Sequence, residues 1–75
     1  MTYPPYRFIR PTSVITHREG HYRLEQLPAG TVFYPNDLHP DHDDMIDGTC
    51  HGDEVMIFSR DLEDRCEPID VEKAL

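Results

Sequence analysis

The residues best suited to chemistry lie in one stretch, residues 36–54, where carboxylates alternate with histidines and a cysteine. The acidic residues there are Asp37, Asp41, Asp43, Asp44, Asp47, Asp53 and Glu54. Side chains of these types can hold cations, transfer protons or present a negative surface to a basic partner. We therefore expect the specific function of the protein to lie in this stretch.

A transition-metal site is one chemistry that the stretch permits. His39 and His42 are three residues apart, Cys50 and His51 follow, and Cys66 lies further along the chain. Imidazole and thiolate groups suit tetrahedral zinc, but structural zinc sites usually take closely paired ligands, and here only the first two histidines approach that spacing. We assign no metal ligand and expect no cofactor. A small zinc-binding domain that uses His39, His42, His51 and Cys50 or Cys66 remains the alternative.

Calcium binding and catalysis find less support. An EF-hand loop that began at Asp41 would need glycine at its sixth position and glutamate at its twelfth, where the chain has Ile46 and Gly52. Ser13 and Ser59 are the two serines, and neither lies in a Gly-x-Ser-x-Gly elbow. The chain also has no glycine-rich phosphate loop. The sequence therefore predicts that the protein is not an enzyme.

The charge is divided unevenly along the chain. The net charge is −8; residues 1–34 hold four arginines and two glutamates, whereas residues 35–75 hold three basic and thirteen acidic residues. A strongly negative field repels nucleic acid and anionic membranes and attracts basic protein surfaces. We therefore expect neither direct nucleic-acid binding nor membrane binding, and we expect a protein partner with a basic surface.

This charge pattern is similar to that of small acidic phage and plasmid proteins that inhibit nucleic-acid enzymes. Fixed carboxylates can compete for the Lys and Arg side chains that otherwise hold a phosphate backbone. We predict a non-enzymatic binding protein that regulates or inhibits a basic partner, such as a nucleic-acid-binding protein, through the seven acidic residues of the stretch. A third hypothesis is a homodimer or larger homo-oligomer, with residues 55–58 or the N-terminal arm buried between copies.

The elements that must position these residues form a single small domain over residues 1–75. Residues 1–5 read as a flexible tail because of two prolines, and residues 36–54 read as one long acidic loop because they show no helix or strand period. The pattern of β-branched, aromatic and turn residues predicts the remaining elements. They are an edge strand or arm at 7–10, a hairpin of 13–16 and 21–26, a strand at 31–34, a central strand at 55–59 buried on both faces, a short helical turn at 61–64, and a last strand at 66–71.

The order and spacing of these elements over residues 13–71 resemble the SH3-like small barrels, in which a single helical turn likewise precedes the closing strand. The resemblance implies an all-β fold, a small antiparallel barrel or twisted sheet of about five short strands, and it implies no function. The chain starts without a charged and apolar leader and has no apolar run long enough to cross a bilayer, so we expect a cytoplasmic protein. In that reducing compartment, the two cysteines are expected to be free thiols or metal ligands.

Two smaller features concern contacts. His17 and His21 flank the predicted hairpin turn; contact between them across the turn is one arrangement, and exposed turn histidines are the more common one. The N-terminal arm carries Tyr3, Tyr6 and Phe8 beside two arginines, a composition that is common in interfaces but also in a leading strand packed on its own domain. We favour packing.

Overall fold

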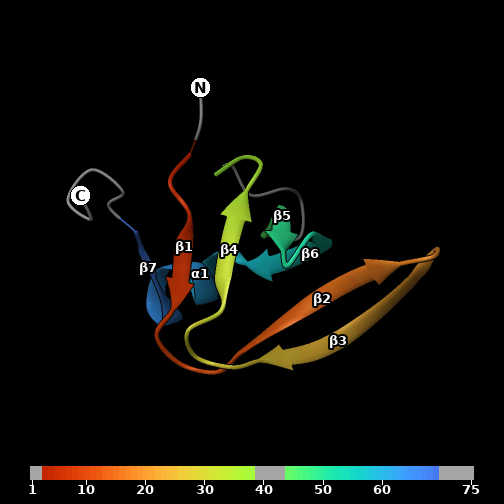
Figure 1. Cartoon of the computed structure of the whole chain (residues 1–75), viewed down its shortest axis with the longest axis horizontal. Helices are drawn as coiled ribbons and strands as arrows, with labels where there is room; N and C mark the ends of the chain where they lie inside the picture. The colour runs from red at the N-terminus through yellow and green to blue at the C-terminus, as the bar shows by residue number, and fades with distance from the viewer. Residues whose placement is uncertain (1–2, 39–43, 70–75) are drawn as a thin grey trace.

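In the described part of the chain, seven antiparallel strands form one sheet, in the order β3-β2-β6-β5-β4-β1-β7 (Figure 1). The computed structural model describes residues 3–38 and 44–69. The strands are β1 (Tyr6–Phe8), β2 (Thr12–Arg18), β3 (His21–Leu27), β4 (Val32–Pro35), β5 (Met45–Cys50), β6 (Asp53–Phe58) and β7 (Cys66–Pro68), and the helix α1 (Ser59–Arg65) lies between β6 and β7. The all-β prediction is therefore confirmed as an open antiparallel sheet, and the strand pairs among the described residues do not close it into a barrel.

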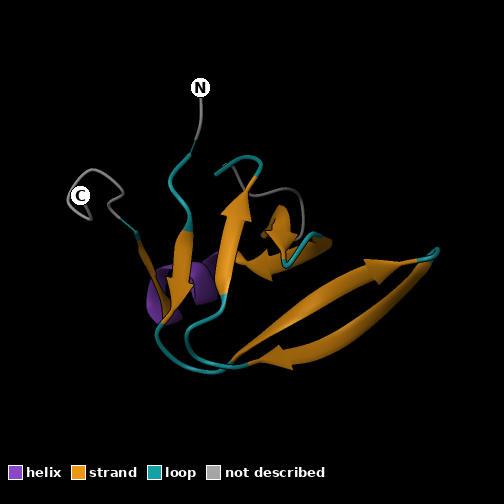
Figure 2. Cartoon of the chain, in the orientation of Figure 1, coloured by secondary structure: helices purple, strands orange, loops and turns teal. Residues whose placement is uncertain are grey.

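The long hairpin of β2 and β3 extends away from the rest of the sheet (Figure 2). Its two-residue turn is Glu19-Gly20, and both residues have positive φ, 52° and 79°. Two-residue turns of this kind match the right-handed twist of the strands they join, which explains why a glycine follows the polar residue here. The predicted hairpin is confirmed. Strand β2 is longer than expected because the turn takes only two residues, and β3 extends one residue further than expected, to Leu27.

The core lies on one face of the sheet, because alternate residues of each strand point there. Phe8, Val14, Phe33 and Ile57 are almost fully buried, and Leu62 of α1 packs with them. Helix α1 therefore covers this face with one apolar side chain and turns its charged residues to solvent. The N-terminal arm packs on its own domain, as favoured, since β1 pairs with β4 and β7 and buries Phe8.

The prediction that residues 36–54 form one long loop is wrong. Strand β5 occupies Met45–Cys50, and β6 already begins at Asp53. The two strands are joined by the tight turn His51-Gly52, both of whose residues have positive φ. Residues 39–43 lie outside the described residues. Glycine is typical of loops, and so the sequence pattern does not predict this strand, in whose middle Gly48 lies buried.

Four further expectations need correction. Strand β6 is buried on one face, not on both, since Phe58 on its other face is 40% exposed. Strand β7 ends at Pro68, and residue 69 lies outside any strand. The described sheet has seven strands, not about five. The tail is shorter than predicted, because the carbonyl oxygen of Pro5 accepts a hydrogen bond from the Ile69 amide at 2.8 Å; residues 1–2 lie outside the described residues.

Among the described residues, no helix is long and apolar enough to cross a membrane.

Candidate functional site

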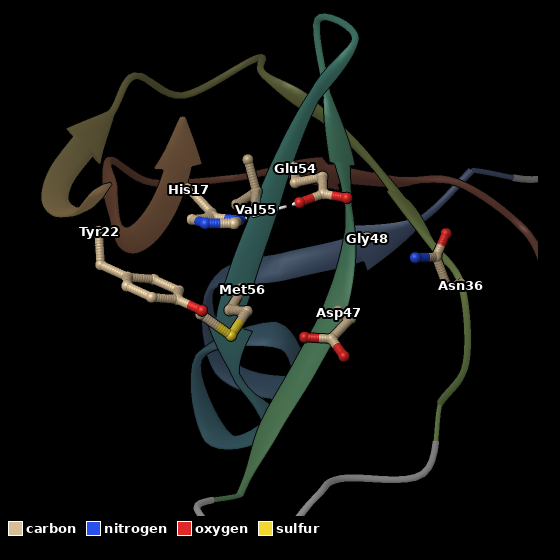
Figure 3. Close-up of a pocket in the computed structure, with 8 residues that line it drawn as sticks. All are labelled: His17, Tyr22, Asn36, Asp47, Gly48, Glu54, Val55 and Met56. Carbon is tan, nitrogen blue, oxygen red and sulfur yellow. Dashed lines mark hydrogen bonds and ion pairs between the residues drawn. The ribbon is translucent and has the colours of Figure 1, made fainter. Parts of the chain in front are cut away.

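The face of the sheet opposite the core carries a shallow hollow of about 290 Å³. The strands β2, β3, β5 and β6 contribute most of its lining, and the rest comes from the residue that follows β4. The lining residues are His17, Tyr22, Asn36, Asp47, Gly48, Glu54, Val55 and Met56 (Figure 3). Two carboxylates, two aromatic rings and a methionine thus meet on an outward-facing part of the sheet.

Strand register explains why the two carboxylates meet. In the β5–β6 pair, Asp47 lies opposite Met56 and Thr49 lies opposite Glu54. Asp47 and Glu54 are therefore diagonal neighbours on the same face of adjacent strands, and the Cα atoms of such neighbours in sheets are typically about 7–8 Å apart. Both residues are exposed, and the Glu54 side chain is 75% exposed. Figure 3 shows them projecting from β5 and β6 into the same hollow.

His17 closes one side of the hollow and orients Glu54. Its Nδ1 atom lies 3.1 Å from Oε2 of Glu54, and its ring stacks on Tyr22 with centroids 4.5 Å apart and planes inclined by 16°. His17 does not face His21 across the hairpin, because His17 pairs with Tyr22 and Arg18 pairs with His21. The ring stack holds the Tyr22 side chain as one wall of the hollow, and Tyr22 remains 64% exposed.

The predicted partner-binding residues do not form one cluster. Asp53 is engaged by Arg18, whose Nη2 atom lies 2.6 Å from Oδ2 of Asp53, so its charge is largely compensated. Asp44 lies at the far end of β5, where its carbonyl oxygen accepts a hydrogen bond from the Ser59 amide, and it lines a different hollow beside α1. Asp37 is exposed just after β4. Asp41 and Asp43 lie outside the described residues.

The cysteines belong to the core. Cys50 and Cys66 are buried free thiols, and they pack with the core residues. Burial raises the pKa of Cys50 to about 11; burial, with Asp61 and Cys50 nearby, raises the pKa of Cys66 to about 12. Thiols with such pKa values are protonated at neutral pH and are therefore poor nucleophiles.

The zinc alternative gains no support from the described part of the chain. Within residues 3–38 and 44–69, no group of three or more His, Cys, Asp and Glu side chains is placed to hold a metal ion. His51 is exposed in the β5–β6 turn, whereas Cys50 points into the core. His39 and His42 lie outside the described residues.

Sequence reasoning placed Asp47 and Glu54 at the site but missed His17, Tyr22 and Met56. The signal for His17 was available, since the alternation along residues 12–18 puts it on the face opposite Val14 and Thr16. The contribution of Met56 depended on the pairing of β6 with β2 and β5, which no local pattern reveals.

In comparisons with known proteins, no family model matches the sequence, and no curated protein and no solved structure matches the chain.

Proposed function

We propose that this protein is a non-enzymatic binding protein that receives a lysine or arginine side chain of a basic partner in the hollow between Asp47 and Glu54. By occupying that basic surface it acts as a regulator or inhibitor of the partner, in the cytoplasm. The observation that carries the proposal is the convergence of two exposed carboxylates from adjacent strands beside a fixed aromatic wall.

The strand register suits a cation. Carboxylates on diagonal neighbours of one sheet face are close enough for both to reach one ammonium or guanidinium group. Among the described residues that line the hollow, none is a lysine or an arginine, so an external cation has no internal competitor other than His17. A charged hydrogen bond of this kind is stronger than a neutral one.

The wall favours arginine over lysine. Tyr22 is held by its stack on His17 and stays accessible, and a planar guanidinium can lie on such a ring while it hydrogen-bonds a carboxylate. The thioether of Met56 adds an adaptable apolar contact for the stem of the incoming side chain. The remaining acidic residues add a long-range field, which speeds the encounter with a basic partner.

A hexa-arginine peptide is a suitable probe, with hexa-lysine for comparison. Chemical-shift changes in a titration of the labelled protein are expected to centre on His17, Tyr22 and Glu54, and binding should weaken as salt rises. The variant Asp47→Asn/Glu54→Gln should lose at least tenfold in affinity. A matched control, Glu63→Gln/Asp64→Asn on the exposed surface of α1, removes the same charge elsewhere and should lose far less.

The proposal also predicts competition with nucleic acid. The labelled peptide, first bound to a short DNA duplex, should be released by the wild-type protein and much less by the Asp47→Asn/Glu54→Gln variant. Equal losses of affinity in the site variant and in the α1 control would show that net charge alone attracts the peptide, and the proposed site would be rejected.

A further inference from the structure

Strand β3 is a long edge strand that the described chain leaves uncovered. It pairs with β2 on one side and ends the sheet on the other, and six of its seven residues are exposed. Leu24 is 72% exposed, and Tyr22 also lies open on this strand. Figure 1 shows the hairpin extending from the rest of the sheet, with β3 on its outer margin. An uncovered edge of this length offers a row of backbone donors and acceptors to another strand.

The hairpin turn fixes which backbone groups point outward. The two-residue turn makes Arg18 and His21 the closing pair, which exchange both of their backbone hydrogen bonds. Hydrogen-bonded and non-hydrogen-bonded pairs then alternate along the hairpin. The amides and carbonyls of Tyr22, Leu24 and Gln26 therefore point away from β2, toward an incoming strand.

We infer that β3 pairs antiparallel with β3 of a second copy of this chain, about a two-fold axis at Leu24. In this register Leu24 faces Leu24, Arg23 faces Glu25 twice, and Tyr22 faces Gln26 twice. A two-fold interface of this kind must be self-complementary, because each residue pair occurs in both senses. The inference uses the outer edge of β3 and does not depend on the function proposed for the hollow.

Other registers between the two β3 strands would give a less stable dimer. An axis at residue 23 places Arg23 against Arg23, and an axis at residue 25 places Glu25 against Glu25; like charges directly opposite one another destabilise a sheet. An axis at residue 22 or 26 would pair only one end of β3 with the second copy. The axis at Leu24 is the midpoint of His21–Leu27, so it pairs the whole strand and also matches its charges.

The other end of the sheet lacks these properties. Strand β7 has three residues, contains Pro68, and carries an ion pair between Glu67 and Arg7 of β1. Short strands, proline and charge are the devices by which natural sheets protect their edges. In β3, Arg23 and Glu25 instead complement the same two residues of a second copy. Leu24 lies beside Ile15 of β2, so the dimer would bring two such apolar pairs together across the axis.

A cysteine at the axis tests the register directly. Cα atoms of a hydrogen-bonded antiparallel pair lie about 5.5 Å apart, a distance that a disulfide spans. The Leu24→Cys variant should form a covalent dimer under mild oxidation, whereas Glu25→Cys, which faces Arg23 of the second copy, should not. Cys50 and Cys66 are buried in both variants, so the wild-type protein serves as the control for their reactivity.

Charge reversal tests the pairing without cross-linking. In sedimentation equilibrium over a concentration series, Arg23→Glu alone and Glu25→Arg alone should each weaken dimerisation at least tenfold. An equimolar mixture of the two variants should dimerise again, because the reversed charges then match. Circular dichroism checks that each variant is folded.

A wild-type protein that stays monomeric up to millimolar concentration would overturn the inference. So would dimers that persist in both charge variants, because the interface would then lie elsewhere. Cross-linking of Glu25→Cys as fast as Leu24→Cys would reject the register.

Discussion

The substitution Gly48→Ala is the sharpest test of the fold. General strand propensity predicts that it raises stability, whereas the structure predicts that it lowers stability. Glycine inside a strand is usually worse than alanine by about 0.5–1 kcal/mol, so Gly48→Ala in β5 should by that rule stabilise the protein. In the structure, a Cβ atom at this position would lie 2.4 Å from the carbonyl oxygen of Tyr34 and 2.5 Å from the ring of Phe33. We therefore expect the substitution to be strongly destabilising.

The size of the stability loss depends on whether the atoms around the added Cβ can move away from it. Phe33 is fully buried, and the Tyr34 oxygen belongs to the backbone of β4, which pairs with β5 at this point. Overpacking a core costs about 1–3 kcal/mol and more when backbone must shift. We expect a loss of about 3 kcal/mol, a large fraction of the 4–11 kcal/mol that is typical, at about 0.05–0.15 kcal/mol per residue, of a chain this long.

Urea or guanidinium unfolding, followed by circular dichroism, measures the loss. Gly52→Ala is the matched control, because a Cβ there meets nothing within 4 Å and the cost is limited to its φ of +84°, about 1–2 kcal/mol. In the double variant with Phe33→Leu, stability should recover in part only, since the contact with the Tyr34 oxygen remains. A Gly48→Ala protein as stable as the wild type, or more stable than Gly52→Ala, would refute the packing described here.

Three further predictions concern the packing of α1, one surface ion pair and the two buried thiols. Leu62→Ala should cost about 2–4 kcal/mol in denaturant unfolding, because Leu62 is the buried residue by which α1 packs on the core. Arg18→Ala should cost less than about 1 kcal/mol despite the short contact with Asp53, since the Arg18 side chain is 67% exposed and the Asp53 side chain is 43% exposed. The thiols of Cys50 and Cys66 have pKa values raised above 9.0, so their contribution to stability is complete below pH 9 and is lost as the pH rises toward 11–12. Unfolding midpoints at pH 8 and pH 10 should therefore differ more in the wild type than in the Cys50→Ala/Cys66→Ala variant.

The sequence identified the elements whose signals are local. The β2–β3 hairpin follows from alternation around Glu19-Gly20, and α1 follows from a short charged segment between two strands. Strand β5 was missed because its sequence contains Asp47 and Gly48, which read as loop residues. Gly48 is required there by the approach of Phe33 and the β4 backbone, and this contact joins segments that no local pattern connects.

The site was less predictable than the fold for the same reason. Negative charge along residues 36–54 pointed to Asp47 and Glu54, but it could not separate them from Asp53, whose charge Arg18 compensates. That distinction depends on the register between β2 and β6, where His17 lies opposite Glu54. Composition therefore predicts the sign of the charge on the proposed partner, and strand pairing selects Asp47 and Glu54 as the residues proposed to meet it.

The hairpin links the two proposals. Tyr22 and Leu24 are two residues apart on β3, so their side chains lie on the same, outer face of the sheet. Tyr22 forms the wall of the hollow, and Leu24 lies at the proposed two-fold axis. A two-fold axis perpendicular to the sheet keeps this face on one side in both copies, so a β3-linked dimer presents two hollows in the same direction. A partner with two basic sites would then engage both at once, and its second contact would gain from a high effective concentration. Loss of the dimer should therefore weaken binding to such a two-site partner while leaving the affinity of a single hollow for hexa-arginine unchanged.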